Sequence, residues 1–333
     1  LVDIDGLKTY AGKHWQSAGG DSALFVSGAQ DIHIRNSEFT GNRDCAIYHS
    51  ELPNGEILGN SVHIHHNTFR SCHWGAAAKR LPSGLSIHDN IGINTPQVIV
   101  VSGLTGDTGS GGSVHSNQGF NAFEVVRLDD VSEMSAFNNK SYNHGALLED
   151  GTVSATVFGP AYNTVVRGQG IVNCDVYNNS LRSISPEMVT AGHPVWVVRL
   201  NAGPLEGAPS THNQVHHNSA SVGYGVVQEA SGQADHNRMY ANRGPASMAA
   251  LVSLSGANSL DDDAPIAVDT STSTITGTTS TVDLKSFAVR PNRFARAGDM
   301  IAVKVSGQFA GPAGTKRITV VAGGTTVAFP EGP

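Results

Sequence analysis

Charged and aromatic side chains are scarce in this sequence. Of its 333 residues, 15 % are charged and 6 % are aromatic, whereas glycine occurs 38 times. No run of 18 apolar residues occurs, so the sequence predicts no membrane insertion. Helical periodicity is also missing, which favours a turn-rich, all-β chain over an α/β enzyme.

Cysteines are few and net charge is modest. Cys45, Cys72 and Cys174 show no paired spacing, so we predict buried small apolar residues rather than a disulfide or zinc framework. A net charge of −7 argues against nucleic acid as a partner. No cofactor is expected. The first residues, "LVDIDG", contain neither methionine nor a signal peptide, which fits an excised fragment and leaves the compartment undefined.

A six-residue motif recurs along most of the chain. Each copy ends in a polar residue and has an apolar residue three places earlier, as in "VHIHHN" (62–67) and "LSIHDN" (85–90). The final residues are Ser37, Asn67, Asn90, Asn117, Asn139, Asn179, Asn218 and Asn237. The apolar residues are Ile34, Ile64, Ile87, Val114, Ala136, Val176, Val215 and Ala234. Because the copies recur every 19 to 40 residues, each is expected to mark one coil of a solenoid.

A second apolar segment follows each copy. The segments include "VVRLDD" (125–130), "ALLED" (146–150), "VWVVRLN" (195–201) and "GVVQEA" (225–230). Two short strands per coil, separated by Gly, Asn and Ser turns, are typical of a right-handed parallel β-helix whose coils lie about 4.8 Å apart. We therefore predict this fold over residues 1–256, with the asparagines hydrogen-bonded in one column.

The composition changes after residue 256. Residues 257–283 are rich in Ser, Thr and Asp, which predicts a linker. Residues 284–333 alternate apolar and polar side chains in three runs, which predicts a small antiparallel β-sandwich. Its strands are too few to close a sandwich, so either the chain is truncated or neighbouring chains complete the fold.

The stretch "AGDMIAVKVSGQFAGPAGTKRITVVAGGTTVA" (297–328), following a β-helix, resembles the C-terminal trimerisation sandwich of bacteriophage tail spike or tail appendage proteins. That resemblance implies a homotrimer in the virion, at the phage tail, that acts outside the cell. It also implies binding, and often cleavage, of bacterial surface polysaccharide. The virion-attachment part of such proteins has no counterpart in this sequence.

The first strand of each coil is predicted to present a ridge of rings. The outward series is Arg35, His65, His88, His115, Phe137, Tyr177 and His216. These side chains are expected to stack as a structural ladder or trimer contact, or to form a platform for sugar faces. His63, His65 and His88 could chelate a metal ion, but no carboxylate or thiolate accompanies them, so no metal site is predicted.

The second strand carries more reactive side chains. If the column Val126, Leu148, Val198 and Val227 points inward, the next residue of each strand points outward. The outward residues are then Arg127, Glu149, Arg199 and Gln228, with Asp129, Asp130, Asp150, Asn201 and Glu229 at the same edge. This row is either a charge ladder on a solvated face or the floor of a glycan-binding groove, flanked by insertions at 151–172 and 182–194.

Hydrolysis of a glycosidic bond needs one carboxylic acid and one carboxylate, about 5 Å apart for retention and about 6.5–9.5 Å apart for inversion. The candidate catalytic residues are Glu149, Asp130, Asp129, Asp150 and Glu229. Those on adjacent coils are expected to give the shorter separation, and Asp130 with Glu229 the longer one. Glu149, predicted between Arg127 and Arg199, would stay ionised as base or nucleophile while the arginines hold an acidic sugar.

Elimination is the rival chemistry, because it needs a cation to neutralise a uronate carboxylate and a base to remove the neighbouring proton. His49, His73, Lys79 and Arg80 are expected on one outward stretch that could supply both, with Trp74 stacking on a sugar. The predicted substrate-binding residues are Arg127, Arg199, Trp74, His73, Lys79 and Tyr177. The sequence thus leaves three functions open: a hydrolytic depolymerase, a lyase or epimerase, and a non-catalytic receptor-binding spike.

Overall fold

The computed structural model describes most of the chain up to residue 261 and a short segment near its end. The described residues are 1–11, 22–27, 29, 31–50, 61–79, 84–103, 109–145, 163–204, 207–245, 247–256, 258–261, 319–322 and 325–328. Within these ranges, no helix is both long and apolar enough to cross a membrane.

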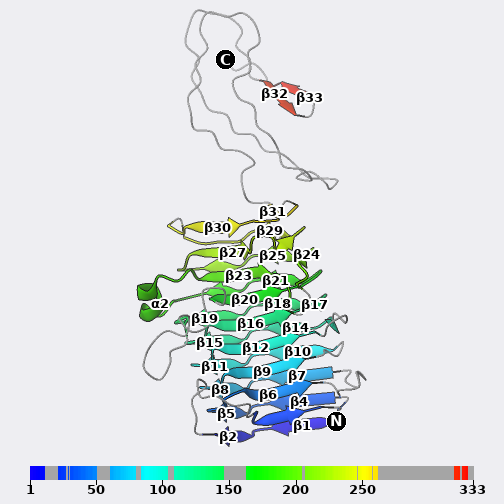
Figure 1. Ribbon diagram of the computed structural model, residues 1–333, viewed down its shortest axis with the longest axis vertical. Helices are drawn as coiled ribbons and strands as arrows, with labels where there is room; N and C mark the ends of the chain where they lie inside the picture. The colour runs from blue at the N-terminus through cyan, green and yellow to red at the C-terminus, as the bar shows by residue number, and fades with distance from the viewer. Residues whose placement is uncertain are drawn as a thin grey trace, which may run out of the picture. The chain divides into compact units, whose positions relative to one another are not determined.

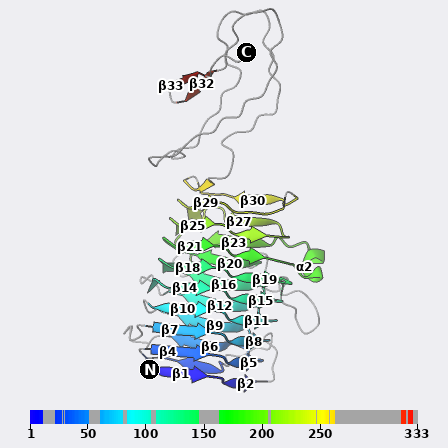
Figure 2. The ribbon, with the colours of Figure 1, turned by 180° about the vertical axis from the view of Figure 1, so that it is seen from behind.

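Three parallel sheets run side by side along the chain's first compact unit, as Figures 1 and 2 show. Sheet A contains β1 (Val2–Asp5), β4 (Asp31–Arg35), β7 (Ser61–His65), β10 (Leu85–His88), β14 (Ser113–His115), β18 (Ser135–Phe137), β21 (Asp175–Tyr177), β25 (Gln214–His216), β29 (Arg238–Tyr240) and β31 (Leu260–Asp261). Sheet B contains β2 (Lys8–Tyr10), β5 (Glu38–Thr40), β8 (Thr68–Arg70), β11 (Ile91–Ile93), β15 (Gln118–Phe120), β19 (Lys140–Tyr142), β22 (Ser180–Leu181) and β26 (Ser219–Ala220). Sheet C contains β3 (Leu24–Val26), β6 (Cys45–Ser50), β9 (Trp74–Lys79), β12 (Gln97–Ser102), β16 (Glu124–Asp129), β20 (Thr164–Gln169), β23 (Trp196–Asn201), β27 (Gly225–Glu229) and β30 (Ala250–Ser253).

Each strand pairs with strands one coil before and one coil after it, which confirms the predicted parallel β-helix. Two minor ladders add to the main sheets: β13 (Gly109–Ser110) pairs with β17 (Val131–Ser132), and β24 (Ser210–Thr211) pairs with β28 (Ala234–Asp235). Helix α2 (Pro186–Ala191) lies outside the stacked strands (Figure 1). Its N-cap is Ser185, whose Oγ accepts a hydrogen bond from the Met188 amide.

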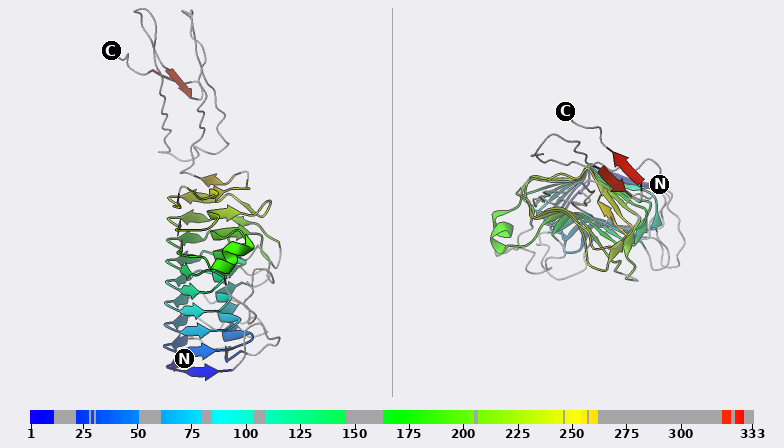
Figure 3. Two further views of the ribbon diagram at one scale, coloured as in Figure 1. Left: turned by 90° about the vertical axis from the view of Figure 1, so that its left-hand side faces the viewer. Right: turned by 90° about the horizontal axis from the view of Figure 1, so that it is seen from above.

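The core follows from the alternation of apolar and polar residues along each strand. The predicted inward column from Ile34 to Val215 is confirmed, because every member is fully buried. Its side chains belong to one continuous apolar cluster inside the coils, the region seen end-on in Figure 3. Cys45, Cys72 and Cys174 are free and buried, as predicted.

Asparagine side chains join successive coils at one corner. The Nδ2 of Asn67 donates to Asn90 Oδ1, Asn90 to Asn117 and Asn117 to Asn139, each at 3.0 Å. The ladder continues through Asn179 and Asn218 to Asn242. Each carboxamide also satisfies backbone groups that the turn leaves unpaired, so the column stabilises every corner it passes.

The prediction that Asn237 is the last member of the asparagine column was wrong. Asn237 lies in a second ladder, where it accepts from Asn213 and its own backbone N–H donates to Ser259 Oγ. The strand that continues sheet A is β29, in which Met239 pairs with Val215. Ala234 belongs instead to the β24–β28 ladder, which continues the parallel pairings of Ser132, Val172 and Thr211 on earlier coils.

The β-helix extends beyond the predicted boundary at residue 256, since β31 pairs with β29. By compactness the chain divides into residues Leu1–Val289 and Arg290–Pro333. In the second unit β32 (Thr319–Ala322) and β33 (Thr325–Ala328) form an antiparallel hairpin. The start of the predicted linker thus belongs to the β-helix, while residues 262–283 and the rest of the predicted sandwich lie outside the described residues.

Candidate functional site

The outward face of sheet C carries a column of three arginines in the middle of the β-helix. Val126, Val166, Val198 and Val227 form one inward column in register. The next residue of each strand faces outward, and these residues are Arg127, Arg167, Arg199 and Gln228. Consecutive strands lie about 4.8 Å apart, so three guanidinium groups occupy neighbouring positions on one rigid face.

The predicted place of Glu149 in this column was wrong, because Arg167 occupies it. The prediction places the strand of this coil at "ALLED" (146–150), whereas the strand is β20 (Thr164–Gln169). Part of the predicted 151–172 insertion is therefore sheet. Glu149 and Asp150 themselves lie outside the described residues.

Glu124, at the start of β16, pairs with the central arginine. Its Oε1 lies 2.8 Å from Arg167 Nε, and both side chains are at most 1 % exposed. The Gln97 side-chain amide donates to the other carboxylate oxygen. Burial raises the pKa of Glu124, and the opposing effect of Arg167, Arg127 and Gln97 is smaller. The sequence reasoning missed this residue, although its position just before "VVR" marks it as the neighbour of an arginine.

Asp129 is the predicted catalytic carboxylate that lies beside the arginine column. Its Oδ2 lies 2.7 Å from Arg127 Nε, and the two side chains are 4 % and 19 % exposed. Arg199 Nε donates to Asn201 Oδ1 at 3.1 Å. Burial, followed by repulsion from Arg167, lowers the pKa of Arg199. The face thus holds three guanidinium groups together with two buried carboxylates, Glu124 and Asp129.

Asp130 is buried at the corner that follows β16. Its backbone is left-handed, with φ of 47°, and its N–H donates to Gln169 O at 2.7 Å. A methyl group built on Gly170 or Gly203 would collide with Asp130 Oδ1, so this carboxylate packs tightly against the glycines of later coils. This packing gives Asp130 a structural role at the turn.

Glu229 points into the β-helix rather than toward the row. It pairs in register with the core residue Leu200. Its carboxylate accepts from Asn237 Nδ2, Ser259 Oγ and the amides of Ser255 and Gly256. The strands of Asp129 and Glu229 are separated by three coil steps, about 14 Å at strand spacing, so the predicted inverting pair with Asp130 is not formed.

The proposed elimination residues near the N-terminal coils divide between two sides of sheet C. Lys79 faces outward, with Nζ 5.2 Å from the Trp74 ring and 5.3 Å from the Tyr48 ring. His73 contacts Trp74 edge-on, and its pKa is lowered mainly by burial. His49 was wrongly predicted to face outward: it pairs with the core residue Ala78, and burial lowers its pKa to about 4.

Tyr48 and the three arginines belong to one outward column of sheet C. In register order it contains Phe25, Tyr48, Ala77, Val100, Arg127, Arg167, Arg199, Gln228 and Ser253. Phe25 and Tyr48 stack with their ring centroids 5.4 Å apart. Arg80, which was predicted to lie near Lys79, falls outside the described residues. The column therefore changes from aromatic to apolar to cationic along one direction.

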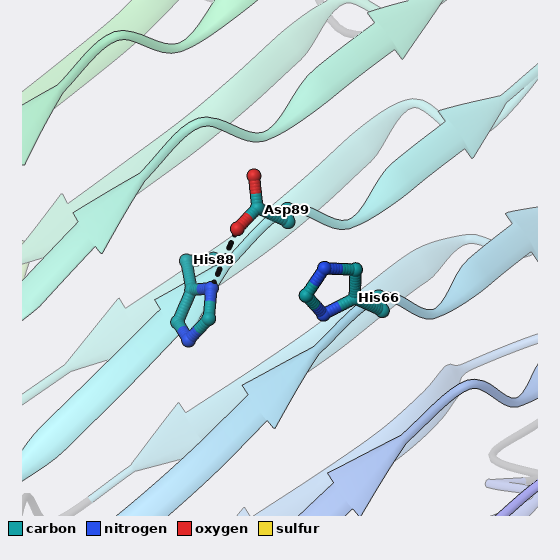
Figure 4. A group of neighbouring side chains, drawn as sticks. All are labelled: His66, His88 and Asp89. Atoms are coloured by element: carbon teal, nitrogen blue, oxygen red, sulfur yellow. Dashed lines mark hydrogen bonds and ion pairs between the residues drawn. The ribbon is translucent and has the colours of Figure 1, made fainter.

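The predicted ridge of rings is confirmed on sheet A, a different face. His65, His88, His115, Phe137, Tyr177 and His216 stack with centroids 4.5–5.1 Å apart, and Tyr240 extends the series. Tyr177 therefore does not share a surface with Arg127 or Arg199. Within the described residues, the group suited to holding a metal ion lies at the edge of this ridge and consists of His66, His88 and Asp89 (Figure 4).

No protein-family description matches the sequence. No curated protein shows significant sequence similarity to it. Among solved structures, the alginate lyase from Paenibacillus sp. str. FPU-7 is similar, with 12 % identity, coverage of 72 % of this chain and 76 % of that chain, and a TM-score of 0.47.

Two further similar structures are carbohydrate-processing enzymes. DFA-IIIase from Arthrobacter chlorophenolicus A6 has 14 % identity and a TM-score of 0.46 over 77 % of this chain and 60 % of that chain. The mannuronan C-5 epimerase A-module from Azotobacter vinelandii has 12 % identity and a TM-score of 0.36, with coverage of 78 % of this chain and 83 % of that chain. At these identities the likeness concerns the fold alone.

Proposed function

We propose that this chain binds an acidic polysaccharide along sheet C and cleaves it beside Arg127 and Arg199. The observation that carries the proposal is the arginine column with Asp129 at its edge. Three guanidinium groups on consecutive coils repel one another, and the described carboxylates that pair with them are Glu124, on the buried Arg167, and Asp129, on Arg127. Guanidinium groups recognise carboxylates through paired hydrogen bonds, which suits the carboxylates of a uronic-acid polymer.

The extent of the column fits a polymer better than a small molecule. From Phe25 to Arg199 it passes through seven strands, or about 29 Å at strand spacing. Phe25 and Tyr48 offer ring faces on which sugar faces pack, and the arginines lie further along the same line. A glycan bound lengthwise would contact the aromatic and the cationic parts of the column, while Ala77 and Val100 between them are buried against Tyr48 and Trp74.

The described side chains favour elimination over hydrolysis. Elimination needs a cation against the uronate carboxylate and one base, roles that Arg199 and Asp129 would fill. Asp129 would accept the proton from the carbon next to the carboxylate, a C=C bond would form, and the glycosidic C–O bond would break. The leaving sugar would take a proton from solvent.

Hydrolysis is the second candidate, and it would need another carboxylate near Asp129. Glu124 is fully buried and ion-paired, Asp130 is packed against glycines and Glu229 faces inward. A hydrolytic pair would therefore recruit Glu149 or Asp150.

The biological setting is proposed from the resemblance of residues 297–328 to tail spike trimerisation sandwiches. In that setting the chain is a homotrimeric phage tail spike, and the glycan is a capsule, exopolysaccharide or O-antigen on the bacterial surface. A spike that binds without cleaving is the remaining alternative.

The experiment compares cleavage of a polyuronate with cleavage of the same polymer after its carboxyl groups have been reduced. Unsaturated products, detected by ultraviolet absorbance, indicate elimination, and saturated reducing ends indicate hydrolysis. We expect Asp129→Asn to lower cleavage by about a hundredfold or more, the effect of losing a general base. Arg199→Met is expected to weaken binding of the polyuronate but not of the reduced polymer.

Arg182→Met is the control, because it removes the same charge from an exposed position outside sheet C. If Arg182→Met and Arg199→Met weaken binding equally, the arginine column is not the binding site. Binding of the polyuronate without any product would support the non-catalytic spike.

A further inference from the structure

Four polar side chains converge where β7 and β10 end, on the sheet A side of the β-helix. His65 and His88 occupy equivalent places on these neighbouring strands, and His66 and Asp89 follow them at the corner. His88 Nδ1 lies 2.8 Å from Asp89 Oδ2, and His65 Nδ1 lies 2.8 Å from His66 Nδ1. Donor atoms of His66, His88 and Asp89 lie within 4.8 Å of one another, and Figure 4 shows the His66 ring beside the other two.

The donor set fits a transition-metal ion. His65 Nδ1 lies 2.8 Å from His66 Nδ1, so a hydrogen bond between the two rings orients the His66 imidazole. With zinc–nitrogen bonds of about 2.0–2.1 Å, two adjacent ligands lie about 3 Å apart. Imidazole nitrogens with one carboxylate oxygen are the donors of zinc-type ions, whereas calcium takes oxygen ligands.

The fold holds these ligands in place. The rings of His65 and His88 stack at 4.9 Å with an interplanar angle of 2°, and His88 stacks on His115 at 4.8 Å. His66 and Asp89 adopt left-handed backbone conformations, with φ of 55° and 54°, which fix where their side chains leave the corner. At equivalent corners Asn138 and Asn178 have the same conformation, so histidine at this place is not required by the turn.

We propose that His66, His88 and Asp89 bind one divalent transition-metal ion of the zinc class and so tie two consecutive coils together, with His65 in contact with His66 beside the site. This site lies on sheet A and is independent of the glycan face on sheet C. The residues come from two copies of the repeat, "VHIHHN" and "LSIHDN", in register.

The chain contains its own matched control. His216 and His217 repeat the pairing, with Nδ1 atoms 2.8 Å apart. The neighbouring rings in that stack are Tyr177 and Tyr240, and Asp175 bonds to the opposite nitrogen of His216. Across the described part of the chain, the His66 group is the one with three suitable donors in reach.

The test is titration of the tag-free full chain with Co²⁺, followed by visible absorption, and with Zn²⁺ in competition against a chromogenic chelator. We expect one ion per chain in the wild type. His66→Asn, His88→Phe and Asp89→Asn should each weaken binding by about tenfold or more, since each removes a ligand. His217→Asn should bind as the wild type does. The chosen replacements preserve the corner conformation or the ring stack, so the fold is retained.

Thermal unfolding gives a second readout. Excess Zn²⁺ should raise the Tm of the wild type by a few degrees, because it binds the folded coils, and should leave the Tm of Asp89→Asn unchanged. The proposal is overturned if the wild type binds no ion, if His66→Asn and Asp89→Asn bind as tightly as the wild type, or if His217→Asn weakens binding as much as His66→Asn does.

Discussion

The buried asparagines of the column from Asn67 to Asn218 are tolerated because each carboxamide is satisfied by a partner one coil away. Asn117 illustrates this: it is fully buried, it donates to Asn139 Oδ1 and Ile87 O, and it accepts from the backbone and side chain of Asn90. The same arrangement repeats from coil to coil, so the cost of burying the carboxamides is offset by hydrogen bonds along the whole column.

We predict that Asn117→Ala lowers the free energy of unfolding by about 2–5 kcal/mol, because it leaves the Asn90 amide and the Ile87 carbonyl buried without partners. Urea denaturation monitored by circular dichroism measures the change. Asn138→Gly is the control, since Asn138 is exposed at a left-handed corner that glycine adopts without strain. Equal losses for the two variants would contradict a structural role of the column.

The strands of sheet C show what the sequence could and could not predict. The inward valines and the outward Arg127 and Arg199 followed from alternation, because a strand has a strict period of two. The strand between those of Arg127 and Arg199 was misplaced. The tripeptide "VVR" at 165–167 identifies this strand, because the same tripeptide occurs at 125–127 and 197–199. The ion pair of Glu124 with Arg167 could not be predicted, because it depends on which strands are neighbours.

The pair Glu124–Arg167 leads to a prediction about sheet C. Arg167→Met should lower the free energy of unfolding at pH 7 by about 3–5 kcal/mol, because a buried carboxylate loses its cation. Burial already raises the pKa of Glu124, and losing Arg167 raises it further. Stability of the variant is therefore lost as the pH rises through that pKa, and it should partly return on acidification from pH 7 toward pH 5.

Denaturation at several pH values tests this expectation. Adding Glu124→Gln to the Arg167→Met variant removes the titrating group, so the double variant should lose the recovery at low pH. If the single and double variants respond to pH in the same way, Glu124 is not the group responsible.

The first compact unit has its own core, and the asparagine column and the ring stack run along it. The repeating core, the asparagine column and the ring stack could be predicted because every coil repeats one local pattern, whereas the inward His49 and Glu229 and the misplaced strand of Arg167 could not be read from that pattern. The grouping of His66 with His88 and Asp89 was not predicted, because Asp89 is adjacent to His88 in sequence but its relation to His66 exists only between coils.

We predict that the full chain is a homotrimer, with a solution mass three times its 34.7 kDa. The physical reason is that the strands expected in residues 284–333 are too few to close a sandwich within one chain, so three chains would have to supply them together. A chain ending at Val289 should remain folded, because its apolar core lies within the first unit, but should become a monomer. Light scattering coupled to size-exclusion chromatography measures both masses. A full-length chain that elutes at the mass of one protomer, or a shortened chain that stays trimeric, would show that the C-terminal unit does not assemble the protein.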